Sequence, residues 1–268
     1  MKYTTKTTML ASLLAITFSS LALNANAVSS AESAVGPLLD NAIAGDHRSA
    51  KNKARDSQRH PKETLMFFGV KPDMKVLEIL PGGGWYTEIL APALKGRGQL
   101  TVASFGADNP SDYMRNTHNS YVANMEANPH VYGAVNVALF EDEGYLTKIA
   151  RDSQDLVLTF RNSHNWIRFG GIEQAYKSFN RVLKKGGVLG VVQHRAAPDA
   201  DVKQAAEKGY IPQAYLIELV ESMGFKLVAQ SEINANVKDT KDHSKGVWSL
   251  PPSYREKDQN REKYRAIG

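Results

Sequence analysis

Three consecutive glycines mark the part of the sequence best suited to bind a ligand. The segment E-I-L-P-G-G-G-W-Y-T runs from Glu78 to Thr87, with glycine at positions 82–84. Because glycine has no β-carbon, the backbone of such a turn can approach a ligand closely. A helix predicted to begin near Trp85 would direct free N–H groups toward the same place. The turn is therefore predicted to hold a carboxylate or a phosphate group.

A second group of reactive side chains follows the apolar run DLVLT. The segment F-R-N-S-H-N-W covers residues 160–166 and supplies a guanidinium group, two amides and an imidazole. His164 is a candidate base because imidazole titrates near neutral pH. The candidate catalytic residues are His164, Arg161 and His194. The candidate substrate-holding residues are Asn162, Asn165, Trp166, Arg195 and His60, and Arg59-His60-Pro61 is expected to reach over the same cleft. The alternative is a structural role for each of these side chains, as hydrogen-bonded histidines and a polar loop around one tryptophan.

Both groups depend on elements that must bring them to one edge of a sheet. Patterns typical of strands cover residues 75–80, 99–105, 135–140, 155–160, 188–193, 225–233 and 246–250. Patterns typical of helices cover residues 61–69, 85–95, 110–127, 171–185 and 211–223. Such alternation with short glycine turns predicts one domain with a doubly wound, parallel α/β sheet. Ligands of these sheets bind beyond the carboxyl ends of the strands.

Several segments of the sequence resemble those of a known superfamily. VLEILPGGGWYTEILAPAL resembles the first motif of class I S-adenosylmethionine (SAM)-dependent methyltransferases, in which an acid precedes a G-x-G-x-G turn. SFNRVLKKGGVLGVVQH resembles their later helix, glycine pair and strand. RHPKETLMFFGVKPDMKVLEILPGGGWYTEILAP, DLVLTFRNSHNW and KDHSKGVWSLPPSYRE are similar to a bacterial family of predicted methyltransferases with signal peptides. The resemblance covers nearly the whole chain after residue 27. It implies a Rossmann-like, seven-stranded sheet, mostly parallel with an antiparallel last strand.

The resemblance also implies a cofactor, SAM, and residues to bind it. These are Glu78, Pro81, Gly82, Gly83, Gly84, Tyr86, Ser104, Asp108 and Glu141. The acid and the glycines would form the methionine-carboxylate and ribose end of the pocket. Tyr86 would wall the pocket together with Trp85, with packing under the turn as the alternative. Glu141 and Asp142 are candidates for the adenine amino group, and a solvated acidic turn is the alternative.

Two positions depart from the superfamily pattern. Leu80 stands where the first glycine of the motif is usual, with Pro81 beside it. Ser104 stands at the end of the second predicted strand, where an acid usually binds the ribose hydroxyls. A serine can make one hydrogen bond there but cannot grip two hydroxyls as a carboxylate can. Asp108, four residues further on, is the candidate replacement.

Composition excludes several other kinds of site. The chain has 268 residues, 42% of them apolar and 23% charged, which is ordinary for a globular protein. The absence of cysteine excludes disulfides, thiolate zinc sites and cysteine nucleophiles. The seven histidines form no H-x-H or H-E-x-x-H spacing, so no metal site is predicted, although histidines brought together by the fold stay an open alternative. No G-x-S-x-G elbow is present.

The first 27 residues are predicted to be a signal peptide. Lys2 and Lys6 precede an apolar run, Leu10–Leu23, and the small-x-small site Ala25-Asn26-Ala27 follows. The run is shorter than the ~20 residues of a membrane span, and an uncleaved anchor is the alternative. We expect a chain from Val28, exported to a bacterial periplasm, with a helical lead-in over 28–70 and a charged tail over 251–268. Its net charge of +3 is too mild to indicate nucleic acid.

These observations support one leading function and two alternatives. The leading hypothesis is a SAM-dependent methyltransferase acting on an unidentified small molecule. The second is an exported, non-catalytic small-molecule-binding protein with a degenerate methyltransferase fold, because the ribose acid is missing and the supply of SAM outside the cytoplasm is unclear. The third, a dinucleotide oxidoreductase, is disfavoured by the same missing acid and by the glycine spacing.

Overall fold

A computed structural model describes residues 35–140 and 145–268 of the chain. The predicted signal peptide lies outside the described residues, and so do Glu141 and Asp142. Within the described part, residues 35–44 form a helix that packs against the main core through Val35, Leu39 and Ala42. The expected lead-in before the sheet is thus helical over its described length.

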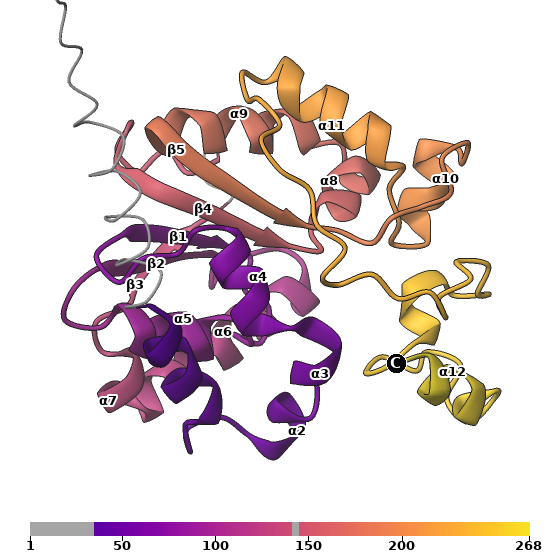
Figure 1. Ribbon diagram of the computed structural model, residues 1–268, viewed down its shortest axis with the longest axis horizontal. Helices are drawn as coiled ribbons and strands as arrows, with labels where there is room; N and C mark the ends of the chain where they lie inside the picture. Colours follow the sequence, from indigo (N-terminus) through magenta and orange to yellow (C-terminus); the bar gives the residue numbers. More distant parts are fainter. Residues whose placement is uncertain (1–34, 141–144) are drawn as a thin grey trace, which may run out of the picture.

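The centre of the fold is a sheet of parallel strands in the order β3-β2-β1-β4-β5 (Figure 1). The strands are β1 (Lys75–Ile79), β2 (Gln99–Ser104), β3 (Asn136–Leu139), β4 (Gln154–Phe160) and β5 (Leu183–Val192). In register, Glu78 of β1 lies between Val102 of β2 and Leu158 of β4. The predicted parallel α/β sheet is confirmed, and β1, which precedes the glycine turn, is its central strand.

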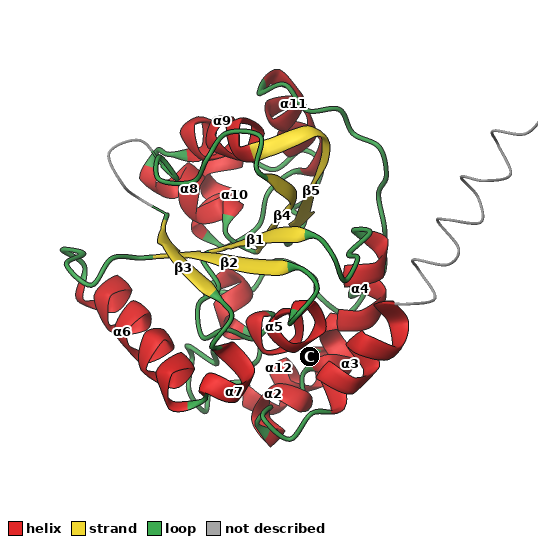
Figure 2. Ribbon diagram, turned by 90° about the vertical axis from the view of Figure 1, so that its left-hand side faces the viewer, coloured by secondary structure: helices red, strands yellow, loops and turns green. Residues whose placement is uncertain are grey.

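Helices cover both faces of the sheet, as Figure 2 shows. One face carries α4 (Pro61–Phe67), α5 (Thr87–Leu94), α6 (Asp112–Ala127) and α7 (Pro129–Tyr132), with the short helices α2 (Ala50–Lys53) and α3 (Asp56–Arg59) beside them. The other face carries α8 (Ser163–Phe169), α9 (Ile172–Val182), α10 (Val202–Glu207) and α11 (Gln213–Ser222). This is the doubly wound arrangement expected for strands and helices that alternate along the chain.

The three inner strands β1, β2 and β4 are largely buried, and their alternate side chains enter two separate cores. Val76 and Val102 point toward the layer that contains α5, whereas Leu77 and Val157 point toward the layer that contains α9. Successive side chains of a strand face opposite sides, so β1, β2 and β4 each contribute to both cores. Two packed layers therefore fix the sheet, and with it the positions where the strands end.

Two segments that were predicted to be strands are not. Residues 225–233 form no regular structure, and Val228 is 83% exposed. The Leu227 amide donates to the Glu221 side chain instead of a neighbouring strand, and the segment leaves the sheet. A strand needs backbone partners, which its apolar residues alone do not supply. The described sheet thus has five strands, all parallel, and the expected seven strands with an antiparallel last one are not formed.

The second of these segments, residues 246–250, forms a 3₁₀ helix, η1 (Gly246–Ser249). Gly246 has a φ of 57° and its amide donates to the His243 carbonyl, which turns the chain rather than extending it. A last helix, α12 (Arg261–Ile267), follows in the tail. The C-terminal region is therefore built from turns and short helices.

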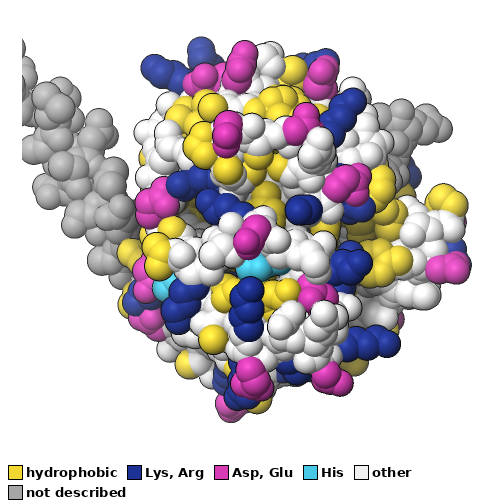
Figure 3. Space-filling model, turned by 90° about the vertical axis from the view of Figure 1, so that its right-hand side faces the viewer, with side chains coloured by type: hydrophobic (Ala, Val, Ile, Leu, Met, Phe, Trp, Pro, Cys, Tyr) yellow, Lys and Arg dark blue, Asp and Glu magenta, His cyan; other side chains and the backbone are white. Residues whose placement is uncertain are grey.

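The carboxyl ends of the strands point to the side where α3 and the C-terminal region lie (Figure 1). Asn234, in the segment after α11, donates a hydrogen bond of 2.9 Å to Thr64 of α4 and lies 3.4 Å from His60. Seen from this side, lysine and arginine side chains lie around the middle of the face, where a histidine is visible (Figure 3). No helix of the described residues is long and apolar enough to cross a membrane.

Candidate functional site

The turn after β1 adopts a backbone conformation that usually requires glycine. Leu80 has a φ of 47°, Gly82 of 60° and Gly84 of 80°. A side chain in this left-handed region costs about 1–2 kcal/mol. Leu80 holds the conformation while its amide donates a 2.8 Å hydrogen bond to the Ala103 carbonyl of β2. The turn therefore keeps a glycine-type shape even where the expected first glycine is a leucine.

The glycines of this turn meet different surroundings. A β-carbon on Gly84 would lie 2.8 Å from the Tyr121 ring, so packing alone requires glycine there. A β-carbon on Gly82 or Gly83 would meet no atom within 4 Å. Gly83 also lacks a positive φ, so no property of the folded chain itself requires glycine at that position. Open space beside a bare backbone is what close approach of a ligand needs.

Glu78 is buried beneath the turn and has one well-defined partner. It is 1% exposed, and its carboxylate accepts a 2.6 Å hydrogen bond from the Thr87 hydroxyl of α5. The Tyr121 hydroxyl in turn donates to Thr87 over 3.2 Å. Burial raises the pKa of Glu78 to about 7, against a smaller lowering by the Thr87 hydrogen bond. Near neutral pH this carboxyl group therefore exists in both protonation states.

At the end of β2, Ser104 is buried and hydrogen-bonded to a histidine that the sequence did not indicate. The Ser104 hydroxyl lies 3.2 Å from Nδ1 of His118, which comes from α6. Asp108 is exposed in the turn after β2. The imidazole of His118 thus stands beside the position that the superfamily pattern gives to an acid.

A row of aromatic rings joins the glycine turn to the end of β4. The rings of Trp85 and Tyr86 are 4.7 Å apart, and Tyr86 stacks on Phe160 at 3.6 Å. The indole nitrogen of Trp85 donates to the Asn52 carbonyl. The Tyr86 hydroxyl is buried close to Thr64 and Arg161 and makes no hydrogen bond of full geometry. Trp85 thus packs under the turn, and Tyr86, the middle ring of the row, carries a buried polar group that is not fully satisfied.

Arg161, His164 and His194 come together where β4 and β5 end. The Arg161 amide donates to the Val192 carbonyl over 2.7 Å, which fixes the end of β4 against β5. Burial and neighbouring arginines, Arg161 among them, lower the pKa of His164 to about 4, although a hydrogen bond with Gln193 opposes the shift. Burial and Arg161 lower the pKa of His194 to about 3. Both imidazoles are therefore neutral at pH 7 and are weaker bases than a free histidine.

Two further arginines reach this place from the segment before α4. The guanidinium of Arg59 lies 4.5 Å from the centre of the Trp85 ring. Burial and the charges of Arg161 and Arg55 lower the pKa of Arg59 to about 8, and burial and Arg161 lower that of Arg55 to about 10. Arg59 was expected over the cleft, whereas Arg55 was not. Arg55 lies four residues before Arg59, and this spacing is the feature of the sequence that could have indicated that Arg55 reaches the same place.

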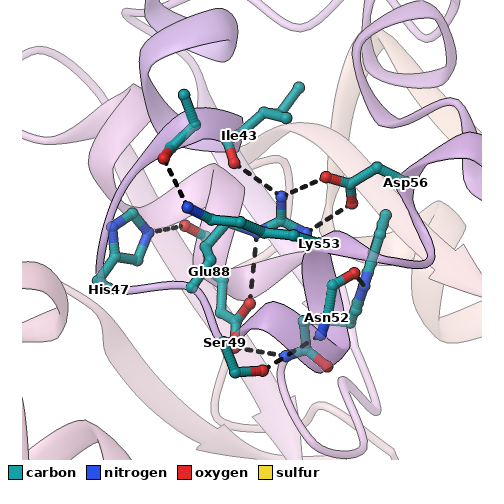
Figure 4. Close-up of polar contacts among 10 residues, drawn as sticks. Ile43, His47, Ser49, Asn52, Lys53, Asp56 and Glu88 are labelled. Carbon is teal, nitrogen blue, oxygen red and sulfur yellow. Dashed lines mark hydrogen bonds and ion pairs between the residues drawn. The ribbon is translucent and has the colours of Figure 1, made fainter.

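A buried ion-pair network fixes the segment that carries these arginines (Figure 4). Arg48 makes two hydrogen bonds of 2.8 Å to the Asp56 carboxylate and one of 3.4 Å to Glu88 of α5. Asn52 donates to the same Glu88 carboxylate over 2.7 Å, and His47 donates to the Glu88 carbonyl. Helices α2 and α3 are thereby tied to the helix that follows the glycine turn.

Asn162 and Trp166, predicted to hold substrate, have structural contacts instead. The Asn162 amide donates to the Ile79 carbonyl and to the Thr159 hydroxyl, which joins the ends of β1 and β4. Trp166 is 3% exposed in the core that contains α9, where it packs against Phe179. It also borders a surface hollow of about 730 Å³ between α8, α9 and α10. Trp166 thus serves the core, because its place on α8 turns it toward α9.

The other predicted substrate residues are also engaged. Asn165 accepts a hydrogen bond from Arg168. Arg195 forms an exposed ion pair with Glu232 at 2.6 Å, and His60 caps the start of α4 with a φ of 40°. Across residues 35–140 and 145–268, no three histidine, aspartate or glutamate side chains gather so that they could hold a metal ion.

Comparison with known proteins places the fold. No model of a protein family matches the chain, and no curated protein matches it either. A SAM-dependent methyltransferase from Aquifex aeolicus is similar in structure, with a TM-score of 0.50 and 16% identity over 66% of this chain and 85% of that one. The [4+2]-cyclase SpnF has a TM-score of 0.50 and 16% identity over 76% of this chain and 72% of that one. The chain therefore has the Rossmann-like α/β fold of SAM-dependent methyltransferases.

Proposed function

We propose that this protein is a SAM-dependent methyltransferase that acts on a small molecule. The observation that carries the proposal is the turn after the central strand, where the bare backbone of Gly82 and Gly83 borders open space. In open parallel sheets, ligands bind beyond the carboxyl ends of the strands, which is where this turn lies. The fold shared with the Aquifex aeolicus methyltransferase supports the same conclusion.

The residues at the turn suit the methionine end of SAM. The Gly82–Gly84 backbone would receive the methionine portion, and Glu78 would support the turn from below. SAM supplies a methyl group attached to a positively charged sulfur atom. On the ribose side, Ser104 and His118 would take the place of the usual carboxylate. The described donors therefore fit the cofactor well at one end and more weakly at the other.

The neighbouring residues would act mainly by orienting the methyl acceptor. His164 and His194 are neutral at pH 7, but their lowered pKa values make them weak proton acceptors. Methyl transfer depends chiefly on alignment of the nucleophile with the methyl carbon and the sulfur. Arg161, at the end of β4, is placed to hold an acceptor in that alignment. We infer that positioning contributes more to this reaction than acid–base catalysis does.

A second candidate is an exported protein that binds a small molecule without catalysis. It is favoured by Ser104, which lacks a carboxylate and is already hydrogen-bonded to His118. The similar structure of SpnF, a [4+2]-cyclase, also favours this candidate, because the fold is then not confined to methyltransferases. Both candidates predict a ligand at the glycine turn, whereas transfer of a labelled methyl group from SAM is expected only for the first.

The glycine turn can be tested with a matched pair of variants. Gly83→Val would fill the open space without straining the chain, and should weaken binding of S-adenosylhomocysteine at least tenfold in a calorimetric titration. Gly36→Val is the control, because Gly36 lies in the helix of residues 35–44, outside the turn, and a β-carbon there would meet only the Lys62 side chain at 3.9 Å. Equal affinity of the two variants and the parent would mean that the turn does not contact the cofactor.

We also propose that this protein is exported before it acts. The basic start, the apolar run and Ala25-Asn26-Ala27 support removal of the first 27 residues in a bacterial periplasm. N-terminal sequencing of protein from the cell envelope should give Val28 as the first residue. Full-length protein recovered from the cytosol would contradict export.

A further inference from the structure

We propose that Arg55, Arg59 and Arg161 form a binding site for the carboxylate or phosphate group of a small-molecule ligand, separate from the glycine turn. The assignment of this cluster as the site of the methyl acceptor rests on the proposed function. Its assignment as a site that binds an anion rests only on the contacts and charges of the described residues. It predicts that the acceptor is an anion rather than a neutral molecule or an amine.

The aromatic row brings the three arginines to one place. The Arg59 guanidinium covers Trp85 at 4.5 Å, Trp85 contacts Tyr86, and Tyr86 stacks on Phe160 at 3.6 Å. Arg161 is the residue after Phe160, so the row joins the α3 segment to the end of β4. All three arginine side chains are half-buried, and a ligand from solvent can therefore reach them.

Among the described residues, none of the three guanidinium groups forms an ion pair. Within the described ranges, no carboxylate oxygen lies within 4.0 Å of the Arg55, Arg59 or Arg161 guanidinium. Asp56 adjoins Arg55 in sequence, but both of its oxygens bind Arg48. Burial together with the charge of Arg161 lowers the pKa of Arg59 and of Arg55. A bound carboxylate or phosphate would relieve this repulsion through charge-assisted, bidentate hydrogen bonds.

An orphaned donor points into the same cluster. The Tyr86 side chain is 2% exposed, and its hydroxyl lies close to Thr64, Arg161 and Arg59 but makes no hydrogen bond of full geometry. An unmade hydrogen bond of a buried hydroxyl costs about 1–3 kcal/mol, so folded proteins rarely leave one without a reason. Because guanidinium groups only donate, they can give a hydrogen bond to the Tyr86 hydroxyl but cannot accept its proton, so a group that uses the free protons of Tyr86 and of the arginines together must be an acceptor. An oxyanion meets that requirement.

The sheet order separates this cluster from the cofactor's nucleoside end. Ser104 ends β2, on one side of the central strand β1, whereas Arg161 ends β4 on the other side. His194, which follows β5 one strand further out, feels the charges of Arg161 and Arg59. The cluster therefore lies toward β4 and β5, away from the side of β2 where the nucleoside of the cofactor would bind. A second molecule could bind there beside the cofactor.

The test is a calorimetric titration of the folded protein with inorganic phosphate. Phosphate should bind the parent, and Arg59→Gln and Arg161→Gln should each weaken binding about tenfold or more, since each removes a charged hydrogen bond. Arg59→Lys, which keeps the charge, should recover part of the affinity. Arg255→Gln is the matched control, because Arg255 also covers a tryptophan, Trp248, at 4.5 Å but lies outside the cluster. Arg55→Gln serves as a second variant if Arg59→Gln does not fold.

A second pair of ligands distinguishes an acceptor site from the cofactor's own carboxylate. S-adenosylhomocysteine carries that carboxylate, and 5′-methylthioadenosine does not. The inference predicts that Arg59→Gln binds both with the parent's affinity while losing phosphate. Loss of S-adenosylhomocysteine affinity alone would assign the arginines to the cofactor and overturn the inference, as would phosphate binding that is absent or unaffected by the substitutions. Phosphate binding that depends on these arginines, in a parent that binds neither adenosyl ligand, would support the anion site and contradict the methyltransferase.

Discussion

Glu78 combines a central position with an unusual protonation behaviour. Its carboxyl group is buried at the end of β1, and burial raises its pKa from 4.5 to about 7. A carboxyl group whose pKa is higher in the folded state binds a proton more tightly when folded. The protein is therefore stabilised by this group's protonation below pH 4.5, and that contribution is lost as pH rises through 7.

Replacing this carboxyl group should change how stability depends on pH. Glu78→Gln retains an oxygen to accept the Thr87 hydrogen bond but has no proton to lose. The free energy of unfolding of the variant, relative to the parent, should rise by on the order of 3 kcal/mol between pH 4.5 and pH 8. Urea unfolding at several pH values measures this difference. The lowered pKa values of His164 and His194 change the pH dependence of the parent and of the variant equally, so their contributions cancel in the difference between the two free energies of unfolding. A constant difference across the range would show that the carboxylate is not strained by burial.

If the proposed function holds, Ser104 determines how firmly the site can hold the ribose of the cofactor. Ser104→Asp would restore the carboxylate of the superfamily pattern beside His118, whose imidazole could offset part of its desolvation. Hydrogen bonds to a charged group contribute about 1.5–3 kcal/mol, against about 1 for a neutral pair. Binding of S-adenosylhomocysteine should tighten about five- to a hundredfold, as measured by calorimetry. Unchanged affinity together with a large loss in Asp108→Ala would assign the ribose to Asp108 instead.

Site residues that directly follow strands could be predicted from the sequence better than site residues contributed by the helical segments. Gly82–Gly84 and Arg161 lie where parallel strands end, and that placement follows from the strand pattern alone. Arg55 and His118 reach the site from helices on one face of the sheet, and no periodicity fixes how far such helices extend over its edge. Trp166 shows the converse, since a residue close to a strand end can still turn into the core.

At the scale of elements, the segment from α2 to α3 depends on a buried cation. The Arg48 side chain is fully buried and joins Asp56 to Glu88, so its loss would leave two carboxylates without their cationic partner, and Glu88 with only the Asn52 hydrogen bond. Arg48→Met should lower the free energy of unfolding by about 3 kcal/mol, measured by urea denaturation. It should also weaken phosphate binding, because the same segment carries Arg55 and Arg59.

The matched control is an exposed ion pair of the same region. Lys62 and Asp40 are 2.6 Å apart and well exposed. Lys62→Met should change the free energy of unfolding by less than about 1 kcal/mol, as is usual for surface pairs. Similar losses in the two variants would mean that burial does not set the importance of the Arg48 network.

The elements of the sheet were predictable because hydrophobic patterns and glycine turns are local. The four strands from 75–80 to 155–160 are found close to their predicted bounds, whereas β5 begins at Leu183, five residues earlier than predicted and within the range predicted for the helix 171–185. Residues 225–233 have the apolar content of a strand, yet their backbone finds no neighbouring strand, and Gly246 turns the chain where a strand was expected. Strand formation at the edge of a sheet depends on distant partners, which a local pattern does not contain.

At the scale of the whole molecule, the fold brings two unlike surfaces to one edge. The glycine turn offers bare backbone and open space, and the arginine cluster beside it offers guanidinium groups that form no ion pair within the described residues. The aromatic row from Trp85 to Phe160 lies between them and keeps them in a fixed relation. A methyl donor on one surface and an anionic acceptor on the other would meet at the end of β4.

The central claim is that this edge binds SAM, and a titration of the unmodified protein tests it most directly. The chain from Val28 is titrated in a calorimeter with SAM, with S-adenosylhomocysteine and, in parallel, with NAD. The account predicts that both adenosyl ligands bind at one site per chain and that NAD does not bind. Binding of NAD alone, or of none of the three, would contradict it.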